Sequence, residues 1–196
     1  MKIAIFDFDG TITDRDTIVP FFLFWIRLTS NIRGLFSLLL FGSFVKLRLM
    51  DTQLFKRKIY SILFNGVNRT VLVKASNSFY HRFVKQHLRK EILDLIKKYN
   101  ADGYRLIVLS ANFKFVIEPF CREFGMECWA IDGIAEGDVM TGELEGAFYH
   151  GKEKLRIAEA RLAEDELENT IAFGDAPSDI YLLKRVKEGI WVGQKS

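Results

Sequence analysis

Cysteine is scarce in this chain of 196 residues, which contains only Cys121 and Cys128. Neither has a histidine at zinc-ligand spacing, so the sequence predicts neither a disulfide framework nor a zinc site. A reducing cytoplasm is therefore the expected compartment. His81, His87 and His150 also lack metal-ligand spacing and a paired nucleophile, and no chemistry is assigned to them.

Dense tracts of one charge are missing as well. The net charge is only +3, and no Lys/Arg tract with interleaved aromatic residues occurs, so binding of nucleic acid has little support. Hydrophobic residues make up 49% of the chain and charged residues 27%, which is the balance of a folded globular protein. The apolar segment 18–50 is interrupted by charged residues, so we do not expect it to cross a bilayer.

Strand-like and helix-like segments alternate outside one long helical stretch. This order predicts an α/β fold with a doubly wound, mostly parallel sheet and an inserted all-helical cap. Residues 1–13 and 84–196 are the expected core, and residues 14–83 the expected cap of three or four helices. The expected strands are 3–8, 105–109, 126–131, 170–173 and 190–192. A hairpin is expected in 132–146, with candidate turns at 136–138 and 141–142. The expected breaks between the helices of the cap are near 31–34, 42, 51–52 and 65–68.

Polar side chains follow three of the expected strands. Asp7 and Asp9 follow the first strand, Ser110 follows the strand 105–109, and Asp175 follows the strand 170–173. In an open doubly wound sheet, ligands bind beyond the carboxyl ends of the strands, near the point where the strand order reverses. We therefore expect these side chains to converge.

The two aspartates at the first strand suit phosphoryl transfer. That reaction needs a nucleophile, a proton donor for the leaving oxygen and positive charge on the phosphoryl oxygens. Asp7 is the candidate nucleophile and would form an aspartyl-phosphate. Asp9 is the candidate general acid, which would then activate water as a base.

A divalent cation is expected between the carboxylate nucleophile and the phosphate, because the two anions repel each other. Mg²⁺ prefers oxygen ligands and retains several waters. The Asp7 carboxylate, the backbone carbonyl of Asp9 and the Asp175 carboxylate are its candidate ligands. Asp179 lies one helical turn after Asp175 and would bind or orient the waters of the metal.

Several groups are candidate ligands of the phosphate oxygens. Ser110 and Thr11 offer hydroxyls, and the amides of Ala111 and Asn112 are expected at the beginning of a helix. A cation is also needed, and it would come from one of two lysines at the beginning of a later helix, Lys152 or Lys154.

These motifs, in this order, resemble those of the haloacid dehalogenase (HAD) superfamily. The resemblance rests on Asp7-Phe8-Asp9-Gly10-Thr11, the apolar strand that ends in Ser110, the later lysine and the segment 174–179. It implies that Asp7 is the nucleophile, Asp9 the acid and base, Ser110 and Lys154 phosphate ligands, and Asp175 a metal ligand. A helical insert directly after the first motif and the segment 140–144 are similar to the phosphoserine-phosphatase-like branch, subfamily IB. The Gly-x-x-Lys pattern of that branch favours Lys154 over Lys152.

The substrate is left open by the sequence. The resemblance admits a phosphoserine-like small metabolite, for which Asp16 occupies the place of a cap glutamate that meets the substrate amine. Asp16 is shorter than that glutamate, and Gly10 replaces the serine that is usual there. Similar hydrophobic inserts occur in phosphatidylglycerophosphate phosphatases, so a lipid phosphate is the other candidate.

The apolar side chains of the insert have two interpretations. They form the core of a small helical cap, or part of them contacts a membrane interface. Arg27, Arg33, Lys46 and Arg48 would suit anionic headgroups, and the location would then be peripheral at the inner face of the membrane.

Two other function classes share parts of this pattern. A receiver-type signalling domain also uses aspartates, a hydroxyl residue, a lysine and Mg²⁺ on a doubly wound sheet, but its acceptor follows a middle strand of the sequence. A non-catalytic membrane-associated protein could bind phosphate with the same residues. The complete set of acids for turnover favours the Mg²⁺-dependent phosphomonoester hydrolase.

Overall fold

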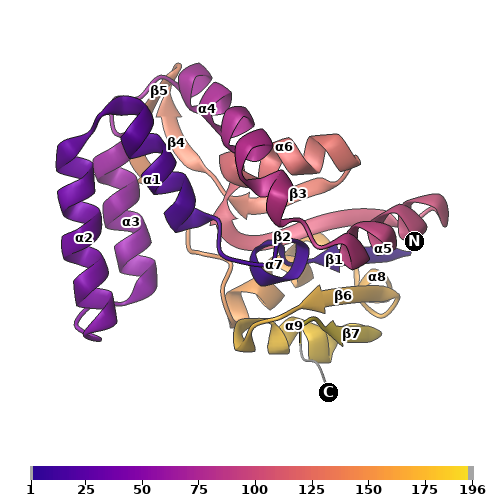
Figure 1. Ribbon diagram of the computed structural model, residues 1–196. Helices are drawn as coiled ribbons and strands as arrows, with labels where there is room; N and C mark the ends of the chain where they lie inside the picture. The colour runs from indigo at the N-terminus through magenta and orange to yellow at the C-terminus, as the bar shows by residue number, and fades with distance from the viewer. Residues whose placement is uncertain (1, 194–196) are drawn as a thin grey trace.

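A five-stranded parallel sheet lies at the centre of the computed structural model, which describes residues 2–193 (Figure 1). Its strand order is β3-β2-β1-β6-β7, and every neighbouring pair is parallel. The order reverses at β1, so the predicted doubly wound fold is confirmed. The strands are β1 (Ile3–Phe6), β2 (Arg105–Phe113), β3 (Glu127–Ile131), β6 (Thr170–Gly174) and β7 (Glu188–Trp191).

Alternate side chains of β1 enter two different hydrophobic clusters, one on each face of the sheet. Ala4 and Phe6 join the cluster that contains α5 (Lys90–Ala101) and α6 (Lys114–Phe124). Ile3 and Ile5 join the other cluster, with apolar residues of the helices on the opposite face. All four residues of β1 are buried, as a central strand of a covered parallel sheet requires. The helices of the second face are α7 (Lys152–Arg161), α8 (Glu164–Leu167) and α9 (Ile180–Arg185).

Four α-helices lie between β1 and α5, and the first three stand beside the sheet in Figure 1. Polar caps explain where three of them begin, because a side-chain oxygen accepts a free amide of the first turn. Asn31 accepts from Gly34, Asp51 from Gln53 and Leu54, and Asn68 from Val71. The four helices are α1 (Ile18–Thr29), α2 (Ile32–Lys46), α3 (Thr52–Phe64) and α4 (Arg69–Arg82).

The predicted break near Gly42 is wrong. Helix α2 continues through this glycine to Lys46, because apolar residues on both sides of it, Phe41 before and Val45 after, pack against the hydrophobic core. None of the helices in residues 2–193 combines the length and the apolar content needed to cross a membrane.

A small antiparallel hairpin joins the helical insert to the sheet. Its strands are β4 (Gly133–Glu136) and β5 (Val139–Leu144), as predicted, and the turn between them contains Gly137. The second predicted turn, at Thr141–Gly142, is wrong, because both residues lie inside β5. Gly142 is required there by a close approach: a Cβ atom would lie 2.9 Å from the Cβ of Asn65 at the end of α3.

Aromatic rings from the helical insert and from the core pack directly on one another. Phe64 of α3 has its ring centroid 5.4 Å from that of Phe115 in α6 and 5.5 Å from that of Trp25 in α1. Phe21 lies 5.2 Å from Phe115 by the same measure. The insert is therefore anchored to the sheet domain by a shared hydrophobic core. The bounds of the cap, residues 14–83, stay a prediction.

We expect Phe64→Ala to lower the free energy of unfolding by about 3–5 kcal/mol, because its ring is fully buried and its removal leaves a cavity. Phe36→Ala is the matched control: 67% of Phe36 is exposed, and we expect a loss below about 0.5 kcal/mol. Urea unfolding of both variants measures the difference. Equal losses would contradict the packing described here.

Candidate functional site

The sequence-predicted site residues meet at the carboxyl end of β1. Phe6 pairs in register with Val108 of β2 and with Phe173 of β6. Asp7 therefore lies one residue, and Ser110 and Asp175 two residues, beyond the same level of three neighbouring strands. The prediction that Ser110 follows its strand is wrong, because β2 extends to Phe113. The amide of Asp7 donates a hydrogen bond to the carbonyl of Phe173 over 2.9 Å, which fixes the chain as it leaves the sheet.

A buried lysine lies between two of the aspartates. The Nζ atom of Lys154 is 3.0 Å from Oδ1 of Asp7 and 2.5 Å from Oδ1 of Asp179. Only 3% of its side chain is exposed. Lys152 is exposed and places its Nζ over the ring of Tyr181, so the structure brings Lys154 and not Lys152 to Asp7.

Asp179 also holds the loop that follows β6. Its second oxygen, Oδ2, accepts the amides of Asp175 and Ala176 over 3.1 and 3.0 Å. Both of its carboxylate oxygens are thus engaged by groups of the protein. The expectation that Asp179 binds or orients the waters of the metal stays a prediction.

Asp175 is held from the opposite side by the first motif. The hydroxyl of Thr11 donates to its Oδ1 over 2.9 Å. Gly10 has a φ of +83°, and a Cβ atom there would lie 2.0 Å from Oδ2 of Asp175. Glycine is required at position 10 because a side chain would displace this carboxylate. Thr11 was expected to bind phosphate, but its single hydroxyl proton is already donated to Asp175.

The acidic residues of the site fit a divalent cation. Carboxylate oxygens of Asp7, Asp175 and Asp179 all lie within 4.8 Å of one another. These three carboxylates surround one ammonium group, that of Lys154, so the cluster has an excess of negative charge. Oxygen-rich clusters of this kind suit Mg²⁺.

Asp9 is held by the residues that begin the helical insert. Its Oδ1 accepts the amide and the hydroxyl of Thr17, over 2.9 and 2.7 Å. Its Oδ2 accepts the side-chain amide of Asn112 over 2.7 Å. The candidate acid is therefore oriented by one residue at the beginning of α1 and by one in β2.

Burial controls the protonation of the two aspartates of the first motif. Desolvation raises the pKa of Asp7 to about 6, although the Lys154 ammonium opposes this shift. Desolvation, aided by the negative charge of Asp16, raises the pKa of Asp9 to about 7. The pKa of Lys154 is raised, because the facing carboxylates of Asp7 and Asp179 outweigh the effect of its burial. Both carboxyl groups thus keep a proton to a higher pH than an exposed aspartate does.

The structure places Asn112 differently from our expectation. Strand β2 continues to Phe113, and α6 begins at Lys114, so Ala111 and Asn112 do not open a helix. The amide of Asn112 donates to the hydroxyl oxygen of Ser110 over 3.2 Å, while its side chain binds Asp9. Asn112 therefore supports the acid and Ser110, and it is not placed to bind phosphate through these donors. Ser110 keeps its own hydroxyl proton for another acceptor.

Two charged residues from the helical insert lie near Asp9, and one of them is the sequence candidate for substrate specificity. Asp16 uses its Oδ1 to accept the amides of Ile18 and Val19, which caps α1. Lys56 of α3 lies close enough to Asp9 to lower the pKa of that carboxyl, against the larger effects that raise it. Asp16 was a sequence candidate, whereas Lys56 was not, because nothing in the pattern of α3 distinguishes it from the neighbouring Arg57 and Lys58.

Thr17 is the other functional residue that sequence reasoning missed. A threonine before an apolar helical run is a typical capping signal, and that signal could have drawn attention to position 17. The partner of its hydroxyl, Asp9, could not be read from the same signal. The hydrogen bond depends on how the insert returns to the sheet.

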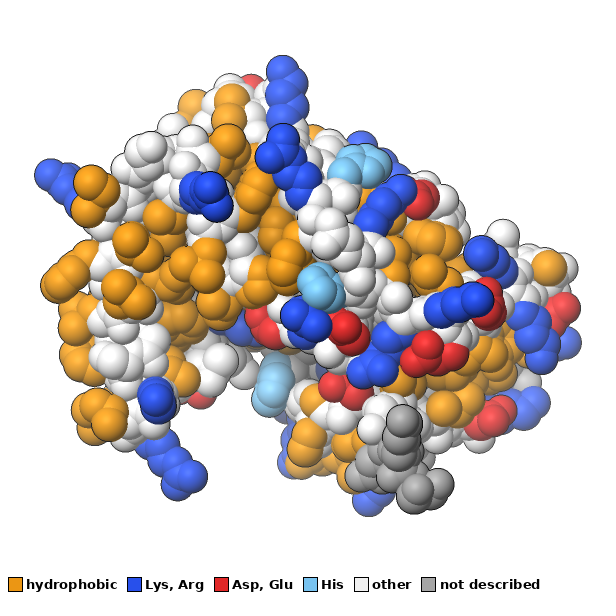
Figure 2. All heavy atoms as spheres, viewed as in Figure 1, with side chains coloured by type: hydrophobic (Ala, Val, Ile, Leu, Met, Phe, Trp, Pro, Cys, Tyr) orange, Lys and Arg blue, Asp and Glu red, His pale blue; other side chains and the backbone are white. Residues whose placement is uncertain are grey.

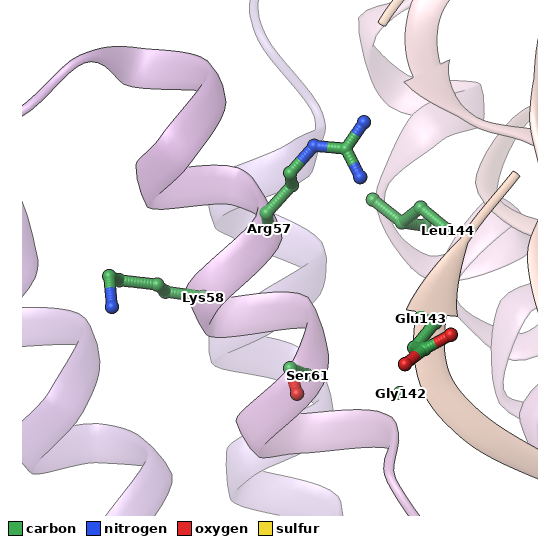
Figure 3. Close-up of a pocket in the computed structure, with 6 residues that line it drawn as sticks. All are labelled: Arg57, Lys58, Ser61, Gly142, Glu143 and Leu144. Atoms are coloured by element: carbon green, nitrogen blue, oxygen red, sulfur yellow. The ribbon is translucent and has the colours of Figure 1, made fainter. Parts of the chain in front are cut away.

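Two pockets lie near these elements, and only one of them reaches the acidic residues. A pocket of about 330 Å³ between α3 and β5 is lined by Arg57, Glu143 and Leu144 among others, and Figure 3 shows Arg57 directed toward β5. No aspartate of the site lines it. A second pocket, of about 300 Å³, is lined by Gly10, Asp175 and residues that include the partly buried Arg89, whose Nε donates to the carbonyl of Gly10 over 3.1 Å. This second pocket opens the Asp175 side of the site to solvent.

Comparison with known proteins gives relatives over most of the chain. The chain is 28% identical over 100 residues to a phosphoserine phosphatase of Archaeoglobus fulgidus, a match that spans 50% of this chain and 29% of that protein. It is 23% identical over 186 residues to the protein CicA of Caulobacter vibrioides, which covers 92% of this chain and 81% of CicA.

Solved structures show the same fold. A protein of unknown function from Bordetella pertussis Tohama I superimposes with a TM-score of 0.78 at 19% identity, over 93% of this chain and 86% of that chain. The family model described as haloacid dehalogenase-like hydrolase matches residues 4–184, a range that includes every residue of the acidic site. The predicted family is thus confirmed, and the chain belongs to the haloacid dehalogenase-like hydrolases.

Proposed function

We propose that this protein is a Mg²⁺-dependent phosphomonoester hydrolase that works through an aspartyl-phosphate on Asp7. The observation that supports this most strongly is the buried Lys154 between Asp7 and Asp179, beside the carboxylate of Asp175. One cation and two further carboxylates thus lie around the carboxylate of Asp7. It is suited to bring a phosphate dianion to an anionic nucleophile.

The first step would be attack of the Asp7 carboxylate on phosphorus. The bond between phosphorus and the ester oxygen breaks, and the leaving oxygen takes a proton from Asp9. The pKa of Asp9, raised to about 7, favours the protonated form that this step needs. Thr17 and Asn112 keep the carboxyl oriented while it acts.

The second step would be hydrolysis of the aspartyl-phosphate. Asp9, now a carboxylate, accepts a proton from a water molecule that attacks phosphorus, and the bond from phosphorus to Asp7 breaks to release inorganic phosphate. Lys154, the hydroxyl of Ser110 and the amide of Ala111 are the proposed ligands of the phosphoryl oxygens. Each would stabilise charge that grows on these oxygens in both steps.

The proposed ligands of Mg²⁺ are the carboxylates of Asp7 and Asp175 and the backbone carbonyl of Asp9. When bound, the ion would neutralise phosphate charge and so reduce its repulsion from the nucleophile. Asp179 would hold Lys154 and the Asp175 loop in place, and it would orient the metal's waters from there.

Two substrate classes remain within this proposal. An amino-acid phosphate is favoured by Asp16 and Lys56, which bring one charge of each sign near Asp9 from the helical insert. The name of the Archaeoglobus fulgidus relative points the same way. A lipid phosphate is favoured by the apolar side chains that α2 exposes. Membership of the HAD family speaks against a receiver-type signalling domain.

We expect the purified protein to release phosphate from at least one member of a panel of amino-acid, sugar, nucleotide and lipid phosphomonoesters, with Mg²⁺ and not with excess EDTA. Asp7→Asn should lower kcat by about 10⁴-fold or more, and Asp9→Asn by about 10²–10⁴-fold. Lys154→Met should also remove activity, whereas Lys152→Met should not.

Absence of turnover on the whole panel would refute the hydrolase in favour of a non-catalytic phosphate-binding protein. Full activity of Asp7→Asn would exclude Asp7 as the nucleophile.

A pair of glycine variants tests the metal site without an activity assay. Gly10 and Gly66 both have positive φ, of +83° and +77°, so alanine strains the backbone at either position. Only at Gly10 would the new Cβ displace Asp175. We expect Gly10→Ala to weaken the affinity for Mg²⁺ at least about tenfold relative to Gly66→Ala, measured by the rise in Tm with added Mg²⁺. Equal affinities in the two variants would show that Asp175 does not bind the ion.

A further inference from the structure

The outer side of α1, α2 and the turn after α2 exposes large apolar side chains. We name this surface the α1–α2 face and define it by Leu28, Ile32, Phe36, Leu39, Leu47 and Leu49. Between 56% and 80% of each of these side chains is exposed. Figure 2 shows hydrophobic side chains gathered over the side of the molecule where α1 and α2 lie in Figure 1.

Helix α2 does not have the polar outer face of an ordinary surface helix. Its inner side is apolar and tightly packed, since Leu38 is buried and a Cβ on Gly34 would lie 2.5 Å from Leu63. Its outer side repeats Ile32, Phe36 and Leu39, which share one stripe at a spacing of four and three residues. Helices of soluble domains place polar residues there. An apolar surface of this extent is typical of an interaction site.

An apolar groove continues this surface between the two helices. It encloses about 510 Å³ and is lined by Leu23, Ile26 and Leu35 together with Arg27. The groove and the stripe of α2 form one surface, because Ile32 belongs to both. The surface therefore extends across two helices.

The charged residues of the segment that forms the α1–α2 face all have the same sign. The chain contains 25 acidic residues, yet none occurs between Asp16 and Asp51. The same segment contains four cations, all exposed, and none of them forms an ion pair with any residue of the range 2–193. The four are Arg27, Arg33, Lys46 and Arg48.

We propose that the α1–α2 face docks onto the surface of an anionic lipid bilayer. Its apolar side chains would enter the boundary between headgroups and acyl chains, and the four cations would contact lipid phosphates. A second copy of this chain fits less well. In a two-fold interface the same surface meets itself, which would bring these cations together with no acid from the segment to pair with them.

The docked surface and the acidic site would be joined by a single helix. Helix α1 is 12 residues long and ends beside the α1–α2 face, while it begins next to Thr17, which binds Asp9. The proposal concerns only where the protein binds. It therefore holds or fails independently of the proposed hydrolysis.

Co-sedimentation with vesicles tests the docking. We expect the protein to bind vesicles of equal parts phosphatidylcholine and phosphatidylglycerol at least about tenfold more strongly than vesicles of phosphatidylcholine alone, and added salt should weaken this binding. The double variant Phe36→Ser/Leu39→Ser should lose at least about tenfold in affinity. Arg33→Glu/Arg48→Glu should bind the anionic vesicles as weakly as the neutral ones.

Val71→Ser is the matched control, because Val71 is 50% exposed on α4, outside the α1–α2 face, and its loss should leave binding unchanged. Thermal unfolding checks that each variant is folded. Failure to sediment with anionic vesicles, or equal binding by Phe36→Ser/Leu39→Ser, would overturn the proposal. A dimer in sedimentation velocity that this double variant abolishes would assign the surface to a second copy of the chain and overturn the bilayer as its occupant.

Discussion

The buried ion pair network of Lys154 is the interaction on which the acidic site depends. Its ammonium group contacts Asp7 at the end of β1 and Asp179 at the beginning of α9. Burial of three charges is unfavourable unless they are paired, and loss of one partner from such a group typically costs about 3–5 kcal/mol. The position of α7, which contains Lys154, is therefore coupled to the sheet and to the loop of Asp175. One cation thus fixes three segments that are distant in sequence.

A second polar network couples the helical insert to the sheet. Asp9 accepts hydrogen bonds from Thr17, at the beginning of α1, and from Asn112, in β2. Asn112 also donates to the hydroxyl of Thr17 over 2.8 Å, which closes the network. Aromatic packing around Phe115 joins the same two parts of the molecule. The candidate acid is thus positioned by the insert as well as by the core.

Prediction from sequence succeeded where a residue's role follows from local pattern. The short buried strand before Asp7 and the polar residues near the ends of later strands predicted which acids lie together, because parallel strands end at one edge of a sheet. It failed where the role depends on a distant partner. Thr11 donates to Asp175 and Asn112 to Asp9, and neither pairing leaves a local signal. Gly142 resembles a turn residue, but contact with α3 explains it.

Periodicity and motifs that are contiguous in the chain were enough to predict the order of strands and helices, the family and which acids meet beyond β1. A family pattern favoured Lys154 over Lys152, but tertiary packing was needed to show that Lys154 faces Asp7 and that α2 turns apolar side chains outward. Two lysines two residues apart on a helix point in different directions, and only packing against the sheet selects one. Likewise, the sequence shows how apolar a helix is, but the elements packed against the helix decide how much of its apolar surface is covered.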